Sequence, residues 1–491
     1  MYAHLFEKLR VLYLIIFCRP FNMRPRYCFF LIFKAIDLPP QPAGDGHRIT
    51  ISDGETVLQL DDIAFGDVYL CAGQSNMEMT VPAVFNAAAE IEDSINYPNL
   101  RLLSVARKTA DTPQVDAPLR ADYAWGRSGP HQINGTHAFN FFSATCYFFG
   151  RELYTSLDGK IPIGLVSSTW GGQRVEAFSS KDAISDTSCG GTHPGLDPNT
   201  RPPIKFDVAN TQLWNGMIHP LVPMRFLGVI WYQGEANDDD PVSYACRFPA
   251  MISDWRQKFD LPDLSFFYVQ LAGYAPGKTW PYLRAAQDAA LQLPRVGLAA
   301  AIDLADPDSP NGAIHPRRKQ EVGRRLSLTA RAIQYEERGD LIHTGPILSG
   351  VHLSVSTEGS HRRTATLSFV PGTADRLHLQ GTAACTTCCS EAPFEIMNAS
   401  GNWTRVAEAR VREDVEEIVI VAGSIQPIWG IRYVWEPKPE CALYNGHCGA
   451  DCHSALPAAP FEWCAYPSGK GTWTGESCKM GQAYSSRKSS E

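Results

Sequence analysis

Short hydrophobic runs alternate with longer amphipathic stretches between residues 67 and 336. The short runs are apolar throughout, and the residues after each run carry apolar positions at helical spacing. Parallel strands buried on both faces of a sheet have this pattern, so the region is predicted to be a doubly wound α/β fold with a mainly parallel sheet. The expected strands are 67–71, 163–167, 226–232, 265–271 and 297–302, and the expected helices include 138–157, 241–259, 281–293 and 319–333.

Apolar and polar residues alternate strictly on both sides of this region. Residues 48–60 alternate around Asp53-Gly54, which predicts a β-hairpin in a small unit beside the main domain. Alternation returns after residue 337, in 351–355, 365–369 and 417–421, and predicts a separate antiparallel β domain. The expected division is 1–37 (an atypical N-terminal segment), 38–66 (a remnant β unit), 67–336 (the α/β domain), 337–440 (a β-rich accessory domain) and 441–491 (a Cys-rich tail).

The first 37 residues differ from the rest of the chain. Lys8 and Arg10 precede an apolar run from Val11 to Cys18, as in a signal peptide, but Arg19-Pro20 ends the run and no small-residue cleavage site follows. Neither this run nor residues 28–33 is long enough to cross a bilayer, so no transmembrane helix is predicted. The segment is either a targeting sequence or an imperfect start to the deduced sequence.

Composition narrows the class of protein. A chain of 491 residues with 44% hydrophobic and 20% charged residues is globular and large enough for two or more domains. The formal net charge is -8 and the basic residues are scattered, so no electrostatic footprint for nucleic acid is present. A small molecule or a glycan is the expected substrate, without nucleic acid and without stable membrane insertion.

The cysteines indicate the redox compartment. Eight of the fourteen crowd into the last quarter, which favours disulfides in an oxidising compartment. They are Cys385, Cys388, Cys389, Cys441, Cys448, Cys452, Cys464 and Cys478. Zinc is the competing interpretation, because Cys385-x-x-Cys388 and Cys448-x-x-x-Cys452-His453 have ligand-like spacing, but no matched pair of CxxC knuckles appears and no metal is expected. Three glycosylation sequons, at Asn134, Asn398 and Asn402, agree with secretion.

Polar residues and glycines collect directly after the predicted strands. Gly73-Gln74-Ser75 follows the first, Gly171-Gly172 the second, Gln233-Gly234-Glu235 the third, and an acidic loop ending at His315-Pro316 follows the fifth. Open α/β sheets bind ligands at the carboxyl ends of their strands. The sequence therefore predicts a crevice at this edge of the sheet.

Ser75 and His315 are the candidate nucleophile and general base of a hydrolase. A serine hydroxyl is a poor nucleophile until a base takes its proton, and His315 stands in a loop fixed by the helix predicted after Pro316. The N–H of Ser75, an N–H of Gly171-Gly172 and the Gln233 amide are candidate oxyanion donors. Each feature alone is more often structural, as a helix cap or a turn, and Glu235 is also explained as a paired carboxylate that holds the crevice together. Their occurrence together at four strand ends favours catalysis.

Four blocks resemble those of the SGNH-hydrolase superfamily and, more narrowly, of the sialate O-acetylesterase family, which removes the 9-O-acetyl group from sialic acids. The blocks are 73–77 (GQSNM), 170–177 (WGGQRVEA), 231–237 (WYQGEAN) and 314–320 (IHPRRKQ), and the resemblance runs from about Leu38 into the tail. It implies an SGNH (flavodoxin-like) three-layer fold in which Ser75 attacks the acetyl carbonyl and His315 acts as base and then acid. It also implies an oxyanion hole of Ser75, Gly172 and Gln233, with no metal or cofactor.

The chain departs from the resembled pattern at three places. Many SGNH enzymes have an aspartate two or three residues before the histidine, where this chain has Ala313 and Gly312. The acid partner is therefore Asp303, Asp306 or Asp308, or the site is a Ser-His dyad in which a backbone carbonyl orients the ring. Gln173-Arg174 stands where relatives carry Thr-Pro, and Arg174 either approaches a substrate carboxylate or is solvated. The upstream β module of relatives is mostly missing. The candidate substrate-binding residues are Arg174, Glu235 and Asn237.

The resulting hypothesis is a secreted or lysosomal serine esterase that hydrolyses O-acetyl esters of sialic acids through an acetyl-enzyme. An acetylesterase for other O-acetylated glycans, such as xylan, would use the same chemistry. A glycan-binding glycoprotein on an inactive esterase scaffold is the alternative from another class, and the presence of both Ser75 and His315 argues against it.

Overall fold

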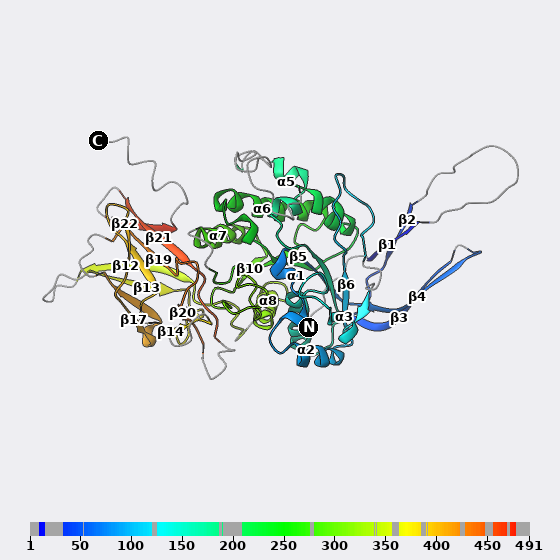
Figure 1. The fold of residues 1–491 in the computed structure, drawn as a ribbon, viewed down its shortest axis with the longest axis horizontal. Helices are drawn as coiled ribbons and strands as arrows, with labels where there is room; N and C mark the ends of the chain where they lie inside the picture. The colour runs from blue at the N-terminus through cyan, green and yellow to red at the C-terminus, as the bar shows by residue number, and fades with distance from the viewer. Residues whose placement is uncertain are drawn as a thin grey trace.

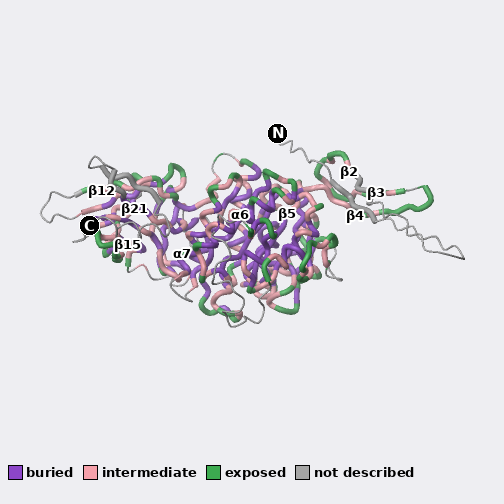
Figure 2. Tube along the Cα trace, turned by 90° about the horizontal axis from the view of Figure 1, so that it is seen from above, coloured by how far each residue is buried: buried purple, intermediate pink, exposed green. Residues whose placement is uncertain are grey.

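The computed structural model places three regions along the long axis of the molecule. An α/β region lies in the middle, two β-hairpins extend from one end and antiparallel sheets lie at the other (Figure 1). Buried positions are concentrated in the α/β region, whereas the β3–β4 hairpin is largely exposed (Figure 2). The structure describes residues 9–14, 33–52, 54–119, 125–185, 189, 209–274, 279–337, 339, 341–355, 363–383, 389, 391–422, 428–446, 455–468 and 472–477.

A seven-stranded sheet forms the centre of the α/β region. Its order is β11-β10-β9-β5-β8-β6-β7, and every neighbouring pair is parallel except β6 with β7. The strands are β5 (Asp67–Gly73), β6 (Leu100–Ser104), β7 (Gly126–Arg127), β8 (Ile163–Thr169), β9 (Gly228–Tyr232), β10 (Ser265–Gln270) and β11 (Val296–Ala300). All residues of β8, β9 and β10 are buried, which explains their continuous apolar runs. The predicted doubly wound, mainly parallel fold is confirmed.

The strand register brings three loops to one point. Gly73, the last residue of β5, pairs with Thr169 at the end of β8 and with Tyr232 at the end of β9. The segments after these three strands therefore leave the sheet side by side. The edge predicted to hold a crevice is assembled by this register.

Helices cover both faces of the sheet. Figure 1 shows α6 and α7 on one side and α8 on the other, and α8 packs against α4. The helices are α1 (Ser75–Glu78), α2 (Ala87–Asp93), α3 (Pro130–Ile133), α4 (Ala144–Ser156), α5 (Lys181–Ser185), α6 (Pro241–Lys258), α7 (Trp280–Gln287) and α8 (Lys319–Ile333). The prediction for 319–333 matches α8 at both ends.

Three features of the α/β region differ from the predictions. The helix expected at 281–293 is α7 only up to Gln287 and continues as a 3₁₀ helix over Asp288–Gln292. The helix expected from residue 138 begins at Ala144, because Ala138 accepts a hydrogen bond from the Thr80 backbone and the Ser143 side chain caps the helix by accepting from the Cys146 N–H at 3.1 Å. The strands β6 and β7 were not predicted. β7 has only two residues, and Arg101, which reaches out to Asp62 at 2.9 Å, interrupts the apolar run of β6.

Two hairpins precede the sheet. The predicted hairpin is present and longer than expected, with β3 (Gly44–Ser52) paired to β4 (Val57–Phe65), and Asp53 of its turn lies outside the described residues. Upstream, β1 (Leu9–Leu14) pairs antiparallel with β2 (Phe33–Leu38). In the described part of the chain, no helix is long and apolar enough to span a membrane.

Antiparallel sheets make up the region after α8, as predicted. One sheet has the order β12-β13-β18-β17, a second β16-β15-β19-β21-β22, and β14 pairs with β20. The strands are β12 (Leu348–Val355), β13 (Arg363–Phe369), β14 (His378–Gly381), β15 (Phe394–Met397), β16 (Trp403–Arg405), β17 (Glu408–Arg412), β18 (Glu417–Val421), β19 (Gly430–Tyr433), β20 (Cys441–Tyr444), β21 (Phe461–Ser468) and β22 (Thr472–Ser477). Three strands from the segment expected to be a tail thus join these accessory sheets. The domain limits themselves stay a prediction.

Disulfides link distant elements. Cys71 of β5 is bonded to Cys146 of α4, Cys189 to Cys246 of α6, and Cys389 to Cys441 of β20, while Cys464 is also disulfide-bonded. Each such link stabilises by on the order of 2–4 kcal/mol. The predicted zinc alternative falls on Cys385, Cys388, Cys448, Cys452 and His453, which lie outside the described residues, as does Cys478. No cluster of His, Cys, Asp and Glu suited to a metal occurs among the residues that are described.

Arg284 of α7 joins the α/β region to the accessory sheets. The side chain is fully buried, and its guanidinium donates to the carbonyls of Leu271 and Ala272 on one side and of Glu436 and Pro437 on the other, at 2.7 to 3.1 Å. Burial lowers the pKa of Arg284 to about 9. Arg284 thus links backbone carbonyls of both regions, although Ala272 also accepts from Trp280 Nε1 at 2.9 Å and Pro437 from the Tyr274 N–H at 3.0 Å.

We expect Arg284→Leu to destabilise the protein by on the order of 3 kcal/mol, because four hydrogen bonds from one buried guanidinium to backbone carbonyls would be lost. The measurement is urea unfolding followed by tryptophan fluorescence. Arg410→Leu, at an arginine that is 66% exposed on β17, serves as the control and should change stability by less than about 0.5 kcal/mol. Equal unfolding midpoints for the two variants would show that Arg284 does not join the regions.

Candidate active site

A sharp turn at the end of β5 presents Ser75. Gly73 has φ +141°, and a Cβ at this position would lie 2.2 Å from the carbonyl oxygen of Tyr232, so only glycine fits. The Gln74 N–H donates to the same carbonyl at 3.0 Å, and Ser75 then begins α1. The chain therefore passes from strand to helix within two residues and holds the hydroxyl at the carboxyl edge of the sheet.

Ser75 and His315 meet although they are 240 positions apart. His315 Nε2 lies 2.9 Å from Ser75 Oγ, and His315 Nδ1 lies 2.7 Å from the carbonyl oxygen of Asn311. A carbonyl can only accept, so Nδ1 carries the proton and Nε2 is left to accept the hydroxyl hydrogen of Ser75. This is the arrangement that a general base needs in order to activate a serine.

The loop that carries His315 is fixed from several directions. The His315 N–H donates to Gly312 at 2.8 Å, the Ser309 hydroxyl donates to the His315 carbonyl at 2.6 Å, and α8 begins four residues after the histidine. The edge of the Phe139 ring packs on the imidazole with centroids 5.0 Å apart. The imidazole is thereby restricted to one orientation.

None of the three predicted acid partners contacts this imidazole. Asp303 binds Arg325 at 2.6 and 2.8 Å, Asp306 binds the guanidinium of Arg317 at 2.6 and 2.8 Å, and Asp308 is exposed. The first two carboxylates are neutralised by arginines instead of facing the histidine. Of the alternatives predicted for Nδ1, the backbone carbonyl is therefore the one that this structure shows.

Burial keeps His315 neutral. Removal from water is the main cause that lowers the pKa of the imidazole below its ordinary value of 6.5, and the ammonium group of Lys319 lowers it further, whereas the Asn311 carbonyl raises it. The neutral form is the one that accepts a proton. His315 is therefore ready to act as a base at neutral pH.

Two backbone donors point to an oxyanion site beside Ser75. The N–H groups of Ser75 and Gly172 have no acceptor among the described residues, whereas the Gly171 N–H is used by Glu78, whose Oε2 accepts it at 2.8 Å. Gly172 has φ +74°, which favours glycine, and a Cβ on Gly171 would lie 3.2 Å from that of Ser75. The loop after β8 is therefore close enough to share an oxyanion with the nucleophile.

Gln233, the third predicted donor, is used inside the scaffold. Its amide nitrogen faces three oxygens, Asn237 Oδ1 at 2.8 Å and the Gln74 side chain and Gln173 carbonyl at 3.2 Å each. Two of these oxygens are fixed as acceptors, because Asn237 Oδ1 also accepts from the Val175 N–H and Gln74 Oε1 from the Ala236 N–H. Both amide hydrogens are thus used, and Gln233 supports the loop after β9 instead of facing an oxyanion.

The predicted substrate-binding residues also belong to this scaffold. Asn237 donates to Glu176 at 3.0 Å, and Glu235 accepts from Asn76 at 2.6 Å. Arg174 is 11% exposed and donates to the Ala236 carbonyl at 2.9 Å and to Asp239 at 2.8 Å, so of the two predicted alternatives a solvated side chain is not what the structure shows.

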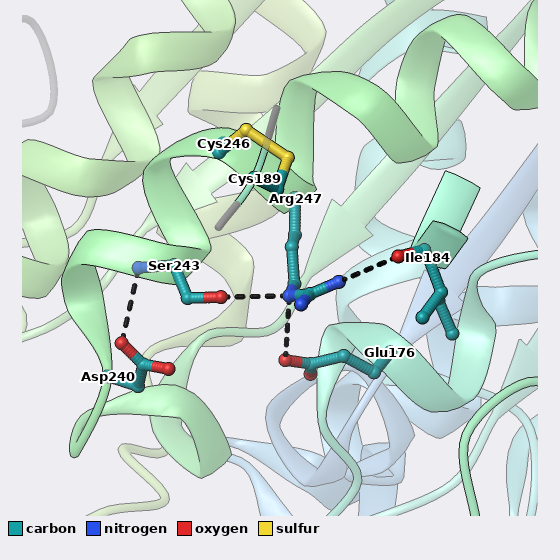
Figure 3. Close-up of a disulfide and its surroundings, with 7 residues drawn as sticks. All are labelled: Glu176, Ile184, Cys189, Asp240, Ser243, Cys246 and Arg247. Atoms are coloured by element: carbon teal, nitrogen blue, oxygen red, sulfur yellow. Dashed lines mark hydrogen bonds and ion pairs between the residues drawn. A yellow bond between two sulfur atoms is a disulfide. The ribbon is translucent and has the colours of Figure 1, made fainter. Parts of the chain in front are cut away.

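Glu176 connects the scaffold to a disulfide. Figure 3 shows Arg247 between Ser243 and Glu176, directly after Cys246, which is bonded to Cys189. The Arg247–Glu176 ion pair is buried at 3.7 Å, with 3% and 1% exposure. The Cys189–Cys246 disulfide therefore adjoins Arg247, and Arg247 pairs with Glu176, the residue that accepts a hydrogen bond from Asn237.

Sequence reasoning assigned no part to two residues of α1. Glu78 is buried and accepts hydrogen bonds from Arg107 as well as from Gly171, and Asn76 is buried and bridges three elements. The only available signal was their position directly after Ser75 among apolar neighbours, where a buried polar group must be paired.

Comparisons with known proteins agree with this geometry. A family model described as carbohydrate esterase, sialic acid-specific acetylesterase, matches residues 65–330. Human sialate O-acetylesterase is 35% identical over 431 residues, which are 82% of this chain and 76% of that protein, and the mouse enzyme of the same name is 33% identical over 465 residues, with 84% and 80% covered. Among solved structures, a carbohydrate acetylesterase from Xanthomonas citri superposes with a TM-score of 0.69 and 29% identity over 88% of both chains.

The acidic limit of activity should lie below pH 6.5. Protonation of His315 removes the base, and because the pKa of the buried imidazole is lowered, activity should persist as the pH falls through 6.5 and decline only below it. The measurement is kcat/KM for 4-nitrophenyl acetate from pH 4 to 9, with the rate of Ser75→Ala subtracted. An acidic limb centred above 6.5 would contradict a buried neutral histidine.

Proposed function

The chain belongs to the sialic acid-specific acetylesterase family of carbohydrate esterases, and on this basis we propose that it hydrolyses O-acetyl esters of sialic acids through an acetyl-enzyme on Ser75. The observation that carries the mechanism is the 2.9 Å contact between Ser75 Oγ and His315 Nε2. Membership of the family supplies the substrate class, and the contact supplies the nucleophile and its base.

The first half of the reaction transfers the acetyl group to the enzyme. Ser75 Oγ attacks the ester carbonyl carbon while its proton moves to His315 Nε2, and the N–H groups of Ser75 and Gly172 stabilise the oxyanion. When the tetrahedral intermediate collapses, the bond from the acyl carbon to the sugar oxygen breaks. His315 returns the proton to that oxygen, and the deacetylated sugar leaves.

The second half releases acetate. Water takes the place of the sugar hydroxyl, gives its proton to His315 as it attacks the acetyl carbon, and a second oxyanion forms between the same two N–H groups. Cleavage of the ester to Ser75 returns the proton to its oxygen and restores the enzyme. These steps use only the described side chains and water.

A dyad suffices for this mechanism because the ring is oriented by the backbone. The Asn311 carbonyl fixes the tautomer of His315, which is one of the two tasks of a triad carboxylate. Its dipole supplies a smaller part of the second task, stabilisation of the imidazolium. An acetyl ester is attacked more easily than an amide, which is compatible with this smaller contribution.

We assign the 9-O-acetyl group as the preferred target and a secreted or lysosomal location. Disulfides, together with exposed sequon asparagines at positions 134 and 402, support an oxidising compartment. The third sequon asparagine, Asn398, instead uses its side-chain oxygen to accept from the backbone of Ser400 and Asn402. We further propose that residues 67–336 are the esterase domain and that the units on either side are accessory.

Ser75→Ala should abolish turnover without changing the fold. Removal of the nucleophile is expected to lower kcat on the order of 10⁴-fold or more, while the melting temperature stays within a few degrees of wild type. The measurement is acetate release from a 9-O-acetylated sialic acid, with a fluorophosphonate probe reporting whether the hydroxyl is labelled. Full activity of the variant would refute the mechanism.

The same assay separates the substrate classes. We expect kcat/KM for 9-O-acetyl sialic acid to exceed that for acetylated xylan by at least about tenfold. A preference for xylan would indicate an acetylesterase for other O-acetylated glycans. Binding of sialic acid without acetate release from either substrate would indicate a glycan-binding protein on an esterase scaffold.

A further inference from the structure

Asn76 connects three of the loops that form the site. Its side-chain nitrogen donates to Glu235 Oε1 at 2.6 Å and to the carbonyl oxygen of Ile314 at 2.8 Å, and its side-chain oxygen accepts from Lys319 Nζ at 2.6 Å. Asn76 follows the nucleophile, Ile314 precedes the histidine, and Glu235 lies in the loop after β9. One amide therefore ties the turn of Ser75 to the loop of His315.

Lys319 and the Ile314 carbonyl together fix which way this amide points. The carbonyl only accepts hydrogen bonds, so the nitrogen of Asn76 must face it, and the amino group of Lys319 donates to the oxygen on the other side. Lys319 is fully buried as the first residue of α8, with its Nζ 5.0 Å from the centre of the Tyr232 ring. The orientation of Asn76 is therefore built into the fold.

The charges around Asn76 are balanced only when the network is complete. Burial lowers the pKa of Lys319 to about 7 and raises that of Glu235, while each group favours the charged form of the other. Asn76 stands between them and hydrogen-bonds to both. Its loss would remove the hydrogen bond of the buried Lys319 amino group and the one to the Ile314 carbonyl, which opens the contact between the two loops.

Since the contact between Ser75 and His315 is made by two loops, its length depends on how those loops are held. Ser75 and His315 are each one residue from an atom of the Asn76–Ile314 hydrogen bond. A displacement of about 1 Å between reacting groups costs on the order of 100-fold in rate. The Asn76–Ile314 hydrogen bond lies next to both residues and therefore controls the distance on which the rate depends.

We propose that Asn76, oriented by Lys319, is a positioning residue that sets the distance between the Ser75 hydroxyl and the His315 imidazole. The proposal rests on the esterase mechanism proposed above and adds to it a role for two residues that touch neither the substrate nor the transferred proton. It also explains why Glu235, predicted to bind substrate, is buried against Asn76 instead.

The test compares two network variants with a matched control. Asn76→Asp keeps the size and the acceptor for Lys319 but cannot donate to Ile314 and faces Glu235 with a like charge. Lys319→Met removes the group that orients the amide. The control is Asn445→Asp in the accessory sheets, because Asn445 is also fully buried and donates to two carbonyls, of Thr344 and Thr373, both at 2.9 Å.

We expect both network variants to lose about 100-fold in kcat at pH 8 on 4-nitrophenyl acetate, with KM changed less than about threefold. At this pH His315 is neutral in every variant, and the amino group of Lys319 has N–H groups to donate to Asn76 whether it is charged or neutral, so kcat reports position and not protonation. The double variant should lose little more than either single one, because Lys319 acts through Asn76. The Asn445→Asp protein should keep a kcat within about twofold of wild type, even if its melting temperature falls as far as those of the two network variants.

Each other outcome contradicts the proposal in a distinct way. A kcat within threefold of wild type in folded network variants would refute the positioning role of Asn76 and leave the proposed esterase function unaffected. An equal loss of kcat in Asn445→Asp would show that the effect is general destabilisation. If Asn76→Asp does not fold, Asn76→Ser leaves room for water at the same position and must show the same loss of kcat. A wild-type protein that hydrolyses no acetyl ester would overturn both this role and the proposed function.

Discussion

The close approach of Gly73 to the carbonyl of Tyr232 is the constraint on which the site depends. Because β5 lies between β8 and β9 and ends at the same level as both, the chain must turn out of the sheet where no side chain fits. The turn places Ser75 beside the loops after β8 and β9. Those loops contribute the Gly172 N–H and the Gln233–Asn237 hydrogen bond. The steric requirement for glycine at position 73 therefore brings most of the site together.

Backbone groups carry much of the chemistry at this site. The tautomer of His315 is set by a carbonyl, and the candidate oxyanion donors are two N–H groups, whereas the nearby side chains are mainly bound to one another. Gln233, Asn237, Glu176 and Arg247 form a buried chain of contacts that ends beside a disulfide. The buried side chains thus hold the loops in place, and backbone groups of those loops orient His315 and face the expected oxyanion.

The sequence was sufficient for what depends on pattern and chain order. Apolar runs predicted the buried parallel strands, and the helix from Lys319 was predicted at both ends. The short strand β6 was missed because Arg101 interrupts its pattern. The roles of Gln233 and Arg174 could not be predicted, because they depend on which residues the amide and the guanidinium contact in the fold. The spacing of residues along the chain does not contain that information. The choice between a carboxylate and a carbonyl for His315 was open for the same reason.

The accessory sheets bear on catalysis through the loop that contains His315. Near the start of this loop, Ile302 packs in the core of the accessory sheets, and Asp303 binds Arg325 of α8 and, at 3.2 Å, Tyr444 of β20. At its other end the loop runs into α8. Because both ends are anchored, the Asn311 carbonyl can hold the imidazole without help from a carboxylate. Asp303 therefore bears on the histidine by fixing the start of its loop to α8 and to the accessory sheets.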